Sequence, residues 1–411
     1  MSMKKTLLRK YAKAIVVVGA NVQKGQSVVI TAAVDNADFT ALVVDEAYKA
    51  GASKVRVDWT CDSITKLHYR HQSLKNLSKV APWQEARLQE SVDECSCKIV
   101  ILSEDPDGLK GVNIAKMQKA NQAVRKITKK YRDQLEGKQQ WVIAAAPSKA
   151  WAKKVFPGER ASVAVEKLWE AILATVYVSE DKDPVEEWNK HNESFLAKCK
   201  ILNDYAFDRL EYKSKNGTDF KVWLIPGAKW MGGGEMSLHG IYFNPNMPTE
   251  EIFTSPMKGR AEGTVVSTKP LAYQGQIIDN FSITFKDGKA VSWKAEKGED
   301  LLGNMLTLDE GAAMLGELAL VPAASPISES NILYYNTLFD ENASCHLAIG
   351  FGFPNVIEGY ENMSLEDIHA LGVNDSITHT DFMIGAEDMS IKGYTKDGKC
   401  VDIFKDGNWA I

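Results

Sequence analysis

The sequence lacks an excess of basic residues, and this absence excludes several classes of partner. Its 411 residues contain 49 Lys and Arg against 54 Asp and Glu, so the formal net charge is −5. Surfaces that bind nucleic acid or anionic membranes normally carry a basic excess, so neither partner is expected. With 45% hydrophobic and 25% charged residues, the composition is that of a folded globular protein rather than a disordered chain.

Long hydrophobic runs and paired cysteines are also missing. The longest apolar stretches, Ala14–Ala20 and Ala312–Ala324, are too short or carry a charge, so no membrane span is predicted. Lys10 and Lys13 interrupt the N-terminal apolar run, which favours an amphipathic helix ending near Gly19 over a signal peptide. No Cys-x-x-Cys pair occurs, and reduced thiols with a cytoplasmic location are expected for the six cysteines, which are Cys61, Cys95, Cys97, Cys199, Cys345 and Cys400.

The first 180 residues alternate between strand and helix signals. Runs rich in β-branched or alternating residues predict four strands, at Ser27–Ala33, Lys54–Trp59, Lys98–Leu102 and Trp141–Ala146. Apolar residues at helical spacing predict three helices, at Asn36–Ala50, Gly111–Leu135 and Ala161–Val178. This alternation is typical of βαβ units, so residues 1–195 are predicted to form an α/β domain with a mainly parallel sheet.

The pattern changes after the charged segment 180–184. A helix is predicted over Val185–Lys200, and short β-like runs follow it, separated by turns rich in glycine and aspartate. Two of these turns, in residues 285–289 and 396–399, carry the Asp-Gly signal of a hairpin. We therefore predict an α+β domain with antiparallel strands over residues 196–411.

The first candidate for chemistry is Glu317, which lies within the apolar run Met314–Val321. A carboxylate buried there without a partner would be costly, so it would need a cation, a hydrogen-bond network or a route to solvent. The alternative is an exposed position on an amphipathic helix. The sequence has no Gly-x-Ser-x-Gly elbow and no phosphate-binding glycine motif, so the chemistry has to come from other residues.

Carboxylates and a histidine gather in the run 340–346. Asp340, Glu341 and His346 precede an apolar segment that contains glycine, a combination that suits a divalent metal. The alternative for the histidine is a buried core position with its hydrogen bonds satisfied. Upstream, within residues 244–254, two prolines and two asparagines predict an irregular loop, and the pair Glu250 and Glu251 follows it. Only one of the pair can face inward in an extended segment, and a solvated acidic turn is the alternative.

A further pair lies in the predicted strand Thr378–Gly385. Side chains alternate along a strand, so His379 and Asp381 would point to one face, either as two metal ligands or as an aspartate that orients a histidine. Taken together, these motifs supply four carboxylates and two histidines within one domain. That set is typical of a two-metal hydrolase, in which a carboxylate bridges ions about 3.5–4 Å apart.

Six segments spread in order along most of the chain carry a family resemblance: KYAKAIVVVGANVQKGQSVVI, AYKAGASKVRVDW, NPNMPTEEIFTSP, LGELALVP, NTLFDENASCHLAIG and SITHTDFMIG. Through them the sequence resembles the aminopeptidase T, AmpS and PepS family of dinuclear metallo-aminopeptidases. The resemblance implies an α/β N-terminal domain, a C-terminal catalytic domain, a peptide substrate and a homodimer that encloses the active sites. It also implies two divalent metal ions per chain, with zinc or cobalt as the expected metals and manganese as a further candidate.

Carried over position by position, the resemblance implies a ligand set for these ions. Its members are Glu251, Glu317, Glu341, His346, His379 and Asp381. The resemblance prefers Glu251 over Glu250. Glu317 would bridge the metals or act beside them as the general base, which makes it the implied catalytic residue.

One position departs from the family pattern. The family has a tyrosine seven residues after the histidine of the DENAxxH motif, and its phenol is thought to stabilise the oxyanion. This chain has Phe353 there, which cannot donate that hydrogen bond. Loss of an oxyanion donor typically lowers turnover by about 10²–10³. Tyr360 lies nearby in the sequence and would substitute if the loop folded back.

Two other functions stay open at this point. A ring-cleaving dioxygenase of dihydroxypyridines is similar to the family's scaffold and uses one iron, which His346, His379 and Asp381 alone would hold. The three glutamates would then have no obvious task. The other alternative is a non-catalytic homologue that binds metal or peptide, and its motivation is Phe353.

Overall fold

The computed structural model describes residues 4–273 and 276–411. The chain divides into two compact units: the first runs to His191 and includes Gly234–Pro248, and the second comprises Asn192–Gly233 and Thr249–Ile411. The chain enters the second unit within helix α9 (Pro184–Tyr205) and returns to the first for the short strands β8 (Glu235–Met236) and β9 (Tyr242–Phe243). The predicted domain boundary after residue 195 stays a prediction.

A four-stranded parallel sheet forms the centre of the first unit, in the order β2-β1-β3-β4. Its strands are β1 (Ser27–Ala33), β2 (Lys54–Thr60), β3 (Cys97–Leu102) and β4 (Trp141–Ala145). These bounds almost coincide with the four predicted strands, and the predicted parallel sheet is confirmed. Val28, Ile30, Ile99 and Val142 are fully buried, as expected for a parallel sheet that is covered on both faces.

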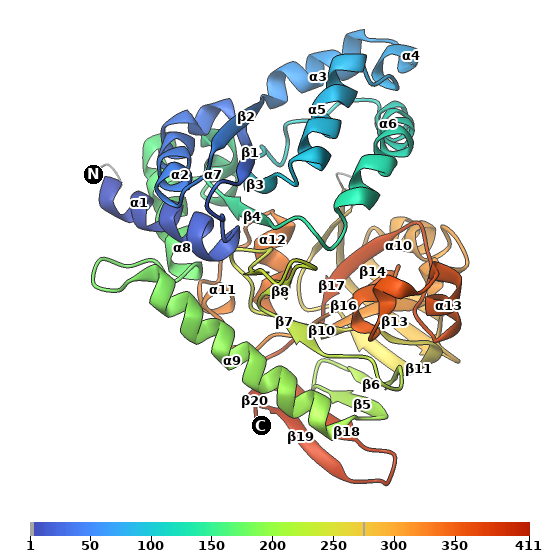
Figure 1. The fold of residues 1–411 in the computed structure, drawn as a ribbon. Helices are drawn as coiled ribbons and strands as arrows, with labels where there is room; N and C mark the ends of the chain where they lie inside the picture. Colours follow the sequence, from blue (N-terminus) through green and yellow to red (C-terminus); the bar gives the residue numbers. More distant parts are fainter. Residues whose placement is uncertain (1–3, 274–275) are drawn as a thin grey trace. The chain divides into compact units, whose positions relative to one another are not determined.

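Helices flank this sheet on both sides, with α2 and α8 on one side and α5 and α6 on the other (Figure 1). The helices of the first unit are α1 (Lys5–Ala14), α2 (Ala37–Lys49), α3 (Asp62–His71), α4 (Leu74–Leu77), α5 (Pro82–Asp93), α6 (Ile114–Leu135), α7 (Lys149–Val155) and α8 (Ala161–Thr175). A π-helical turn over Ile15–Gly19 continues α1, and most of it is buried. The amphipathic helix predicted to end near Gly19 is therefore confirmed.

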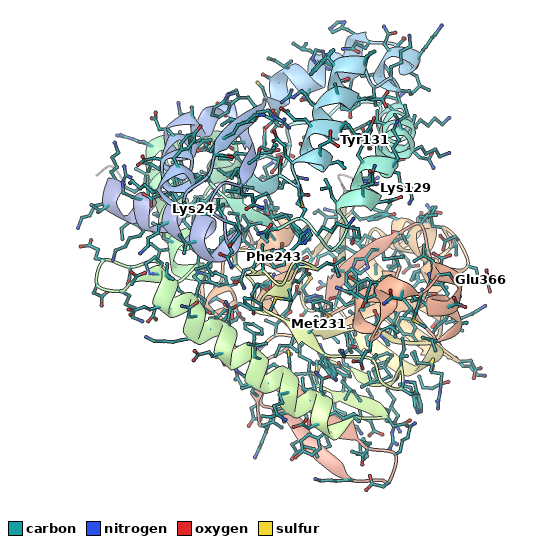
Figure 2. All side chains as sticks on the ribbon, in the orientation of Figure 1. Lys24, Lys129, Tyr131, Met231, Phe243 and Glu366 are labelled. Carbon is teal, nitrogen blue, oxygen red and sulfur yellow. The ribbon has the colours of Figure 1, made fainter. Side chains whose placement is uncertain are left out.

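Aromatic packing joins three of these helices to the sheet. The rings of Tyr11, Phe39 and Trp169 contact one another with centroid distances of 5.4, 6.4 and 5.1 Å. The Tyr11 hydroxyl accepts a hydrogen bond of 3.1 Å from the backbone N–H of Ala145 at the end of β4. Helix α6 is held differently: its buried Tyr131 donates to Glu85 of α5 at 2.8 Å, whereas Lys129 is exposed (Figure 2).

The larger sheet of the second unit has nine antiparallel strands, in the order β12-β13-β11-β6-β5-β18-β19-β20, with β14 paired to β13. They are β5 (Arg209–Lys213), β6 (Asp219–Leu224), β11 (Pro256–Val266), β12 (Leu271–Tyr273), β13 (Gln276–Lys286), β14 (Lys289–Lys297), β18 (Ser390–Tyr394), β19 (Cys400–Lys405) and β20 (Asn408–Trp409). Asp287 and Gly288 both have positive φ, at 51° and 75°, so the predicted hairpin turn between β13 and β14 is confirmed.

The second sheet of this unit carries the residues of chemical interest. Its five antiparallel strands follow the order β17-β16-β15-β10-β7 and are β7 (Met231–Gly232), β10 (Ile252–Thr254), β15 (Leu315–Leu320), β16 (His346–Gly350) and β17 (His379–Met383). Glu317 therefore lies on a strand, and the alternative of an exposed helical position is wrong. The fold class predicted for this half, α+β with antiparallel strands, is confirmed.

One face of the five-stranded sheet packs into the main core of the second unit. Ile252, Leu318, Leu347 and Phe382 alternate onto this face and are almost fully buried together. Four short helices, α10 (Glu299–Leu306), α11 (Pro326–Glu329), α12 (Thr337–Asp340) and α13 (Leu365–Ala370), complete the unit. All six cysteines are free. Among the described residues, no helix is both long and apolar enough to cross a membrane.

A β-bulge at Gly316 sets the direction of Glu317. Leu315 pairs with Ile349 and Glu317 pairs with Ala348, so β15 has one residue more than β16 at this point. A side chain on Gly316 would meet backbone oxygens, because its Cβ would lie 2.1 Å from the carbonyl of Phe351. Only glycine fits between these two strands.

We predict that Gly316→Ala lowers the free energy of unfolding of the second unit by about 1–3 kcal/mol, because the added methyl group forces the two strands apart. Chemical denaturation followed by circular dichroism would measure the change. Gly158→Ala is the matched control, since Gly158 has nothing within 4 Å of the added methyl group. Equal stability of the two variants would contradict the account of the bulge.

Candidate metal centre

The other face of the five-stranded sheet gathers the predicted site residues. Glu317 of β15 lies opposite Ala348 of β16, which in turn lies opposite Asp381 of β17. His346 and His379 open their strands and alternate onto the same face. Because the residue between Glu317 and Asp381 is only an alanine, both carboxylates have room above the middle strand.

Strand β10 brings Glu251 to this face. Phe253 pairs with Ala319, and Glu251 lies two residues earlier, so both are directed to the side of His346. Glu251 Oε2 lies 3.2 Å from His346 Nε2. Glu250 is buried, and its backbone N–H donates to Asn342 Oδ1 at 2.7 Å. Within the described residues, the structure thus brings Glu251 rather than Glu250 into the cluster.

Five of the six predicted ligands form two triads that share one residue. Glu251, Glu317 and His346 make one triad, and Glu317, His379 and Asp381 make the other. Within each triad the donor atoms lie within 4.8 Å of one another. His379 Nε2 is 3.2 Å from Glu317 Oε2 and 3.2 Å from Asp381 Oδ1. Glu317 is therefore the residue that the two triads share.

Backbone carbonyls orient both imidazoles. His379 Nδ1 lies 2.7 Å from the carbonyl oxygen of Phe351, and His346 Nδ1 lies 3.2 Å from that of Ser344. An Nδ1–H donated to a carbonyl leaves Nε2 available to a metal, and in both residues Nε2 is the atom that faces the carboxylates. The sequence does not predict these partners, because every residue has a backbone carbonyl group, whatever its side chain.

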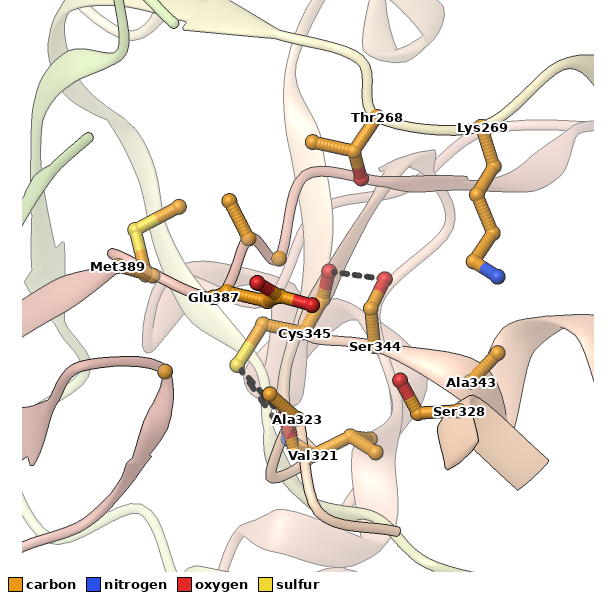
Figure 3. Close-up of a pocket in the computed structure, with 13 residues that line it drawn as sticks. Thr268, Lys269, Val321, Ala323, Ser328, Ala343, Ser344, Cys345, Glu387 and Met389 are labelled. Carbon is orange, nitrogen blue, oxygen red and sulfur yellow. Dashed lines mark hydrogen bonds between the residues drawn. The ribbon is translucent and has the colours of Figure 1, made fainter. Parts of the chain in front are cut away.

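The segment ahead of His346 is itself anchored, as Figure 3 shows. The Cys345 thiol donates to the carbonyl of Val321 at 3.3 Å and accepts from its N–H at 3.4 Å, and the Ser344 hydroxyl donates to the carbonyl of Cys345 at 3.3 Å. Val321, Ser344 and Cys345 are also among the residues that line a small pocket of about 130 Å³. The hydrogen bonds tie the start of β16 to the residue that follows β15, so His346 and Glu317 are held on one support.

Burial and mutual repulsion dominate the electrostatics of the carboxylates. Burial raises the pKa of Glu317 to about 7, with the charges of Asp381 and Glu251 adding to the rise and a hydrogen bond from His379 opposing it. Burial also raises the pKa of Glu341 well above its usual value, again with contributions from Glu251 and Asp381. Glu341 thus lies within the field of the cluster, although neither triad includes it.

The imidazoles respond in the opposite sense. Burial by itself lowers the pKa of His379, but the adjacent Asp381 and Glu317 outweigh it and raise the pKa to about 11. The pKa of His346 rises to about 10, because Glu251 and the other carboxylates likewise outweigh burial. Burial acts to raise the pKa of Asp381, yet the His379 partner keeps it below its usual value. Without another cation, the cluster uses protonated imidazoles to balance its carboxylates.

The arrangement fits divalent metal ions. Four carboxylates share this region with two imidazoles, so the histidines can balance only two of them, and ionising Glu317 and Glu341 as well requires further positive charge. Asp381 Oδ1 is buried, and the polar group recorded next to it is His379 Nε2 at 3.2 Å, which lies equally close to Glu317 Oε2. Oxygen and imidazole donors suit zinc, cobalt and manganese.

Asp340, the other carboxylate of the DENASCH motif, is not part of either triad. It accepts hydrogen bonds from the backbone N–H groups of Tyr334 and Asn336, at 2.8 and 3.0 Å. Glu341 begins a single 3₁₀ turn that leads towards β16. Within the motif, Asp340 therefore stabilises the preceding loop, His346 belongs to the first triad, and Glu341 lies in the electrostatic field of the cluster.

Phe353, which occupies the position where the family pattern has a tyrosine, lies beside the cluster. The rings of Phe353 and His379 have centroids 4.9 Å apart, and Phe253 contacts Phe353 from another direction at 5.4 Å. The Ser255 hydroxyl accepts a hydrogen bond of 2.8 Å from the N–H of Phe353, a contact that the sequence does not indicate. Tyr360 packs against the same small apolar group as Phe353, around Val356.

Known proteins resemble this chain over its whole length. The family described as thermophilic metalloprotease (M29) matches residues 4–409. The aminopeptidase AmpS of Bacillus subtilis (strain 168) is 45% identical over 405 residues, which cover 98% of each chain. The resemblance to the aminopeptidase T, AmpS and PepS family is confirmed, and with it the predicted class of metal-dependent aminopeptidase.

Solved structures agree on the fold. Wild-type AmpT from Thermus thermophilus matches with a TM-score of 0.91 and 34% identity, covering 99% of this chain and 100% of that one. The 2,5-dihydroxypyridine dioxygenase from Pseudomonas putida KT2440 matches with a TM-score of 0.53 and 12% identity, covering 99% and 97%. The second likeness shows a shared fold and says nothing about iron chemistry. The match over residues 4–409 establishes that this chain belongs to the M29 family of metalloproteases.

Proposed function

We propose that this chain removes N-terminal residues from peptides at a centre of two divalent metal ions. The observation that carries the proposal is that Glu317 belongs to both triads of donor atoms. One ion would be held by Glu251, Glu317 and His346, and the other by Glu317, His379 and Asp381, with Glu341 completing the set. The donor types favour zinc or cobalt, and manganese would also be accepted.

The residues of the chain then have separable tasks. Bound divalent ions polarise a carbonyl group and lower the pKa of a water molecule. Glu317 would either bridge the ions or, beside them, take up the proton that water loses as it attacks and return it to the departing amine, as a general base and then a general acid. A carboxylate of the cluster holds the α-ammonium group of the peptide. The Nδ1 bonds of both histidines keep their rings in place throughout.

Two wider features belong to the same proposal. A homodimer is expected from the family resemblance, and sedimentation velocity of the full chain would test it. A cytoplasmic location is expected because all six cysteines are free, which suits a reducing compartment.

The function itself is tested by metal removal. Protein stripped with a chelator is expected to release no amino acid from aminoacyl amides or short peptides, because the proposed hydrolysis requires the bound ions. Reloading with zinc, cobalt or manganese is expected to restore release, with two ions bound per chain by elemental analysis.

The shared position of Glu317 makes the metal count a sharp test. His346→Ala and His379→Ala each damage one triad, so each variant is expected to retain one tightly bound ion. His71→Ala, at an exposed position of α3, is the control and should bind two. A single bound iron in the wild type, or loss of all metal from both histidine variants, would refute the two-ion proposal.

Glu317→Gln is expected to lower kcat by about 10²–10⁴-fold, because glutamine keeps the shape but can neither accept the proton nor serve both ions as a carboxylate donor. Steady-state kinetics with the best substrate would measure the loss, and thermal unfolding would check the fold. Glu310→Gln serves as the control, since the Glu310 side chain is 82% exposed. Turnover at the wild-type level would remove Glu317 from the mechanism.

Phe353→Tyr is expected to raise kcat by up to about 100-fold, since it adds a hydroxyl donor to a ring that already contacts His379. Phe353→Leu removes the ring without adding a donor, and it should not raise kcat. If Phe353→Tyr left kcat unchanged, another group would already stabilise the oxyanion.

A further inference from the structure

The face of the five-stranded sheet that carries the donor residues also carries apolar side chains next to them. Phe253 lies two residues after Glu251 and is directed to the same face. Met231 of β7 lies directly opposite Phe253 in the neighbouring strand, so its side chain shares that face. Both side chains are half-buried, so part of each is open to contact with another molecule.

The ring of Phe353 connects this pair to the metal centre. Its centroid lies 5.4 Å from that of Phe253, 4.9 Å from that of His379 and 6.5 Å from that of Phe351. Aromatic rings at these separations are in contact. All three phenylalanines are half-buried. Together with Met231 they form a continuous surface, which we call the apolar wall, and it ends at a predicted metal ligand.

Packing from behind holds the apolar wall in place. Met231, Phe253 and Phe353 pack against a small buried core, whose members are Ile225, Val356, Ile357, Ile368 and Val373. The N–H of Phe353 also donates to the Ser255 hydroxyl at 2.8 Å. Side chains that are supported on one side and open on the other form a preformed surface for an apolar group of a ligand.

The metal centre is most accessible next to this wall. Among the five residues of the two triads, His379 has the most exposed side chain, at 24%, whereas the side chain of His346 is 1% exposed. The ring in contact with the exposed histidine is that of Phe353. A substrate that reaches the donor atoms from solvent therefore passes the apolar wall.

A peptide whose first bond is cleaved has to place one side chain beside the cluster. The carbonyl group of its N-terminal residue must lie at the donor atoms, and the Cβ atom of that residue is only two bonds from the carbonyl carbon. The other neighbours on this face are carboxylates and small side chains such as Ala319 and Ala348. An apolar side chain gains free energy by burial against the wall, whereas burial against ionised carboxylates is unfavourable for it.

We propose that the apolar wall binds the side chain of the N-terminal residue and selects apolar residues such as leucine. Phe253 and Phe353 determine the specificity, and Met231 extends the wall for longer side chains. The proposal rests on the proposed function, because it names the class of peptides on which the metal centre acts. It also assigns a task to Phe353, since a tyrosine at this position would add a polar hydroxyl to the wall.

The test compares the hydrolysis of L-leucinamide, L-alaninamide and L-asparaginamide by the full chain, loaded with the metal that supports turnover. Leucine and asparagine side chains have nearly the same shape, so this pair separates polarity from size. The kcat/KM of L-leucinamide is expected to exceed that of each other amide by at least about tenfold, because several apolar carbons contact the wall. Phe253→Ala should remove most of this preference, whereas Phe253→Leu, which keeps apolar surface, should retain most of it.

The preference is a ratio measured on one preparation, so any unfolded or metal-poor fraction cancels from it. Trp293→Ala is the matched control, because it removes a half-buried aromatic ring from β14 of the nine-stranded sheet, and it should leave the ratio unchanged. Equal kcat/KM values for L-leucinamide and L-asparaginamide in the wild type would overturn the proposal. Retention of the full preference by Phe253→Ala would overturn it as well.

A binding measurement separates this proposal from the proposed function. Isothermal titration calorimetry with L-leucine and L-asparagine tests the wall of the metal-loaded chain without turnover. L-Leucine is expected to bind more tightly, and Phe253→Ala should reduce the difference. A chain that hydrolysed no amide but kept this difference would contradict the peptidase function and support the wall. Equal binding of the two amino acids, or no binding of either, would overturn the wall.

Discussion

The concentration of carboxylates on one face of a buried sheet is the constraint on which the second unit depends. Carboxylates from β10, β15 and β17 meet beside two imidazoles in a place where water is largely excluded. Such a group cannot stay ionised without cations, because burial penalises each uncompensated charge. The protein holds protons on its histidines in the absence of metal, and it offers shared oxygen and nitrogen donors to any divalent ion that replaces them.

The geometry of the sheet makes this crowding feasible. Antiparallel pairing aligns Glu317, Ala348 and Asp381 in one row, and the small middle residue keeps the two carboxylates from being separated by a bulky side chain. The bulge at Gly316 directs Glu317 onto that row. On the opposite face, Leu318 and Leu347 pack into the core. The same strands thus contribute to the core on one side and carry the candidate metal donors on the other.

Strand β10 divides its residues in the same way. Glu251 serves the charged face, and Thr254, three residues later, lies on the core face. The Phe353 ring completes the charged side next to His379, where the related enzymes are expected to carry a phenol. The scaffold therefore places a candidate metal donor on one side of β10 and core residues such as Ile252 on the other.

Local sequence patterns were sufficient where one periodicity dominated. The strands around Ser27–Ala33 and Trp141–Ala145, and the shared face of His379 and Asp381, follow from β-branched runs and from alternation. The run around Glu317 was ambiguous, since its apolar residues suit a helix as well as a strand buried on both faces. The run forms strand β15 because it pairs with β10 and β16, and both partners lie far from it in the sequence.

The amino-acid sequence by itself determined the α/β and α+β halves, the family, and the residue types available for metal binding. Tertiary structure alone decided which carboxylates meet, since Glu251, Glu317 and Asp381 lie in or next to strands that are far apart in the sequence. It also decided that Glu317 is shared by both triads and that backbone carbonyls orient the histidines. The physical reason is that periodicity records which way a side chain points along its own strand, whereas strand order and register determine what it meets.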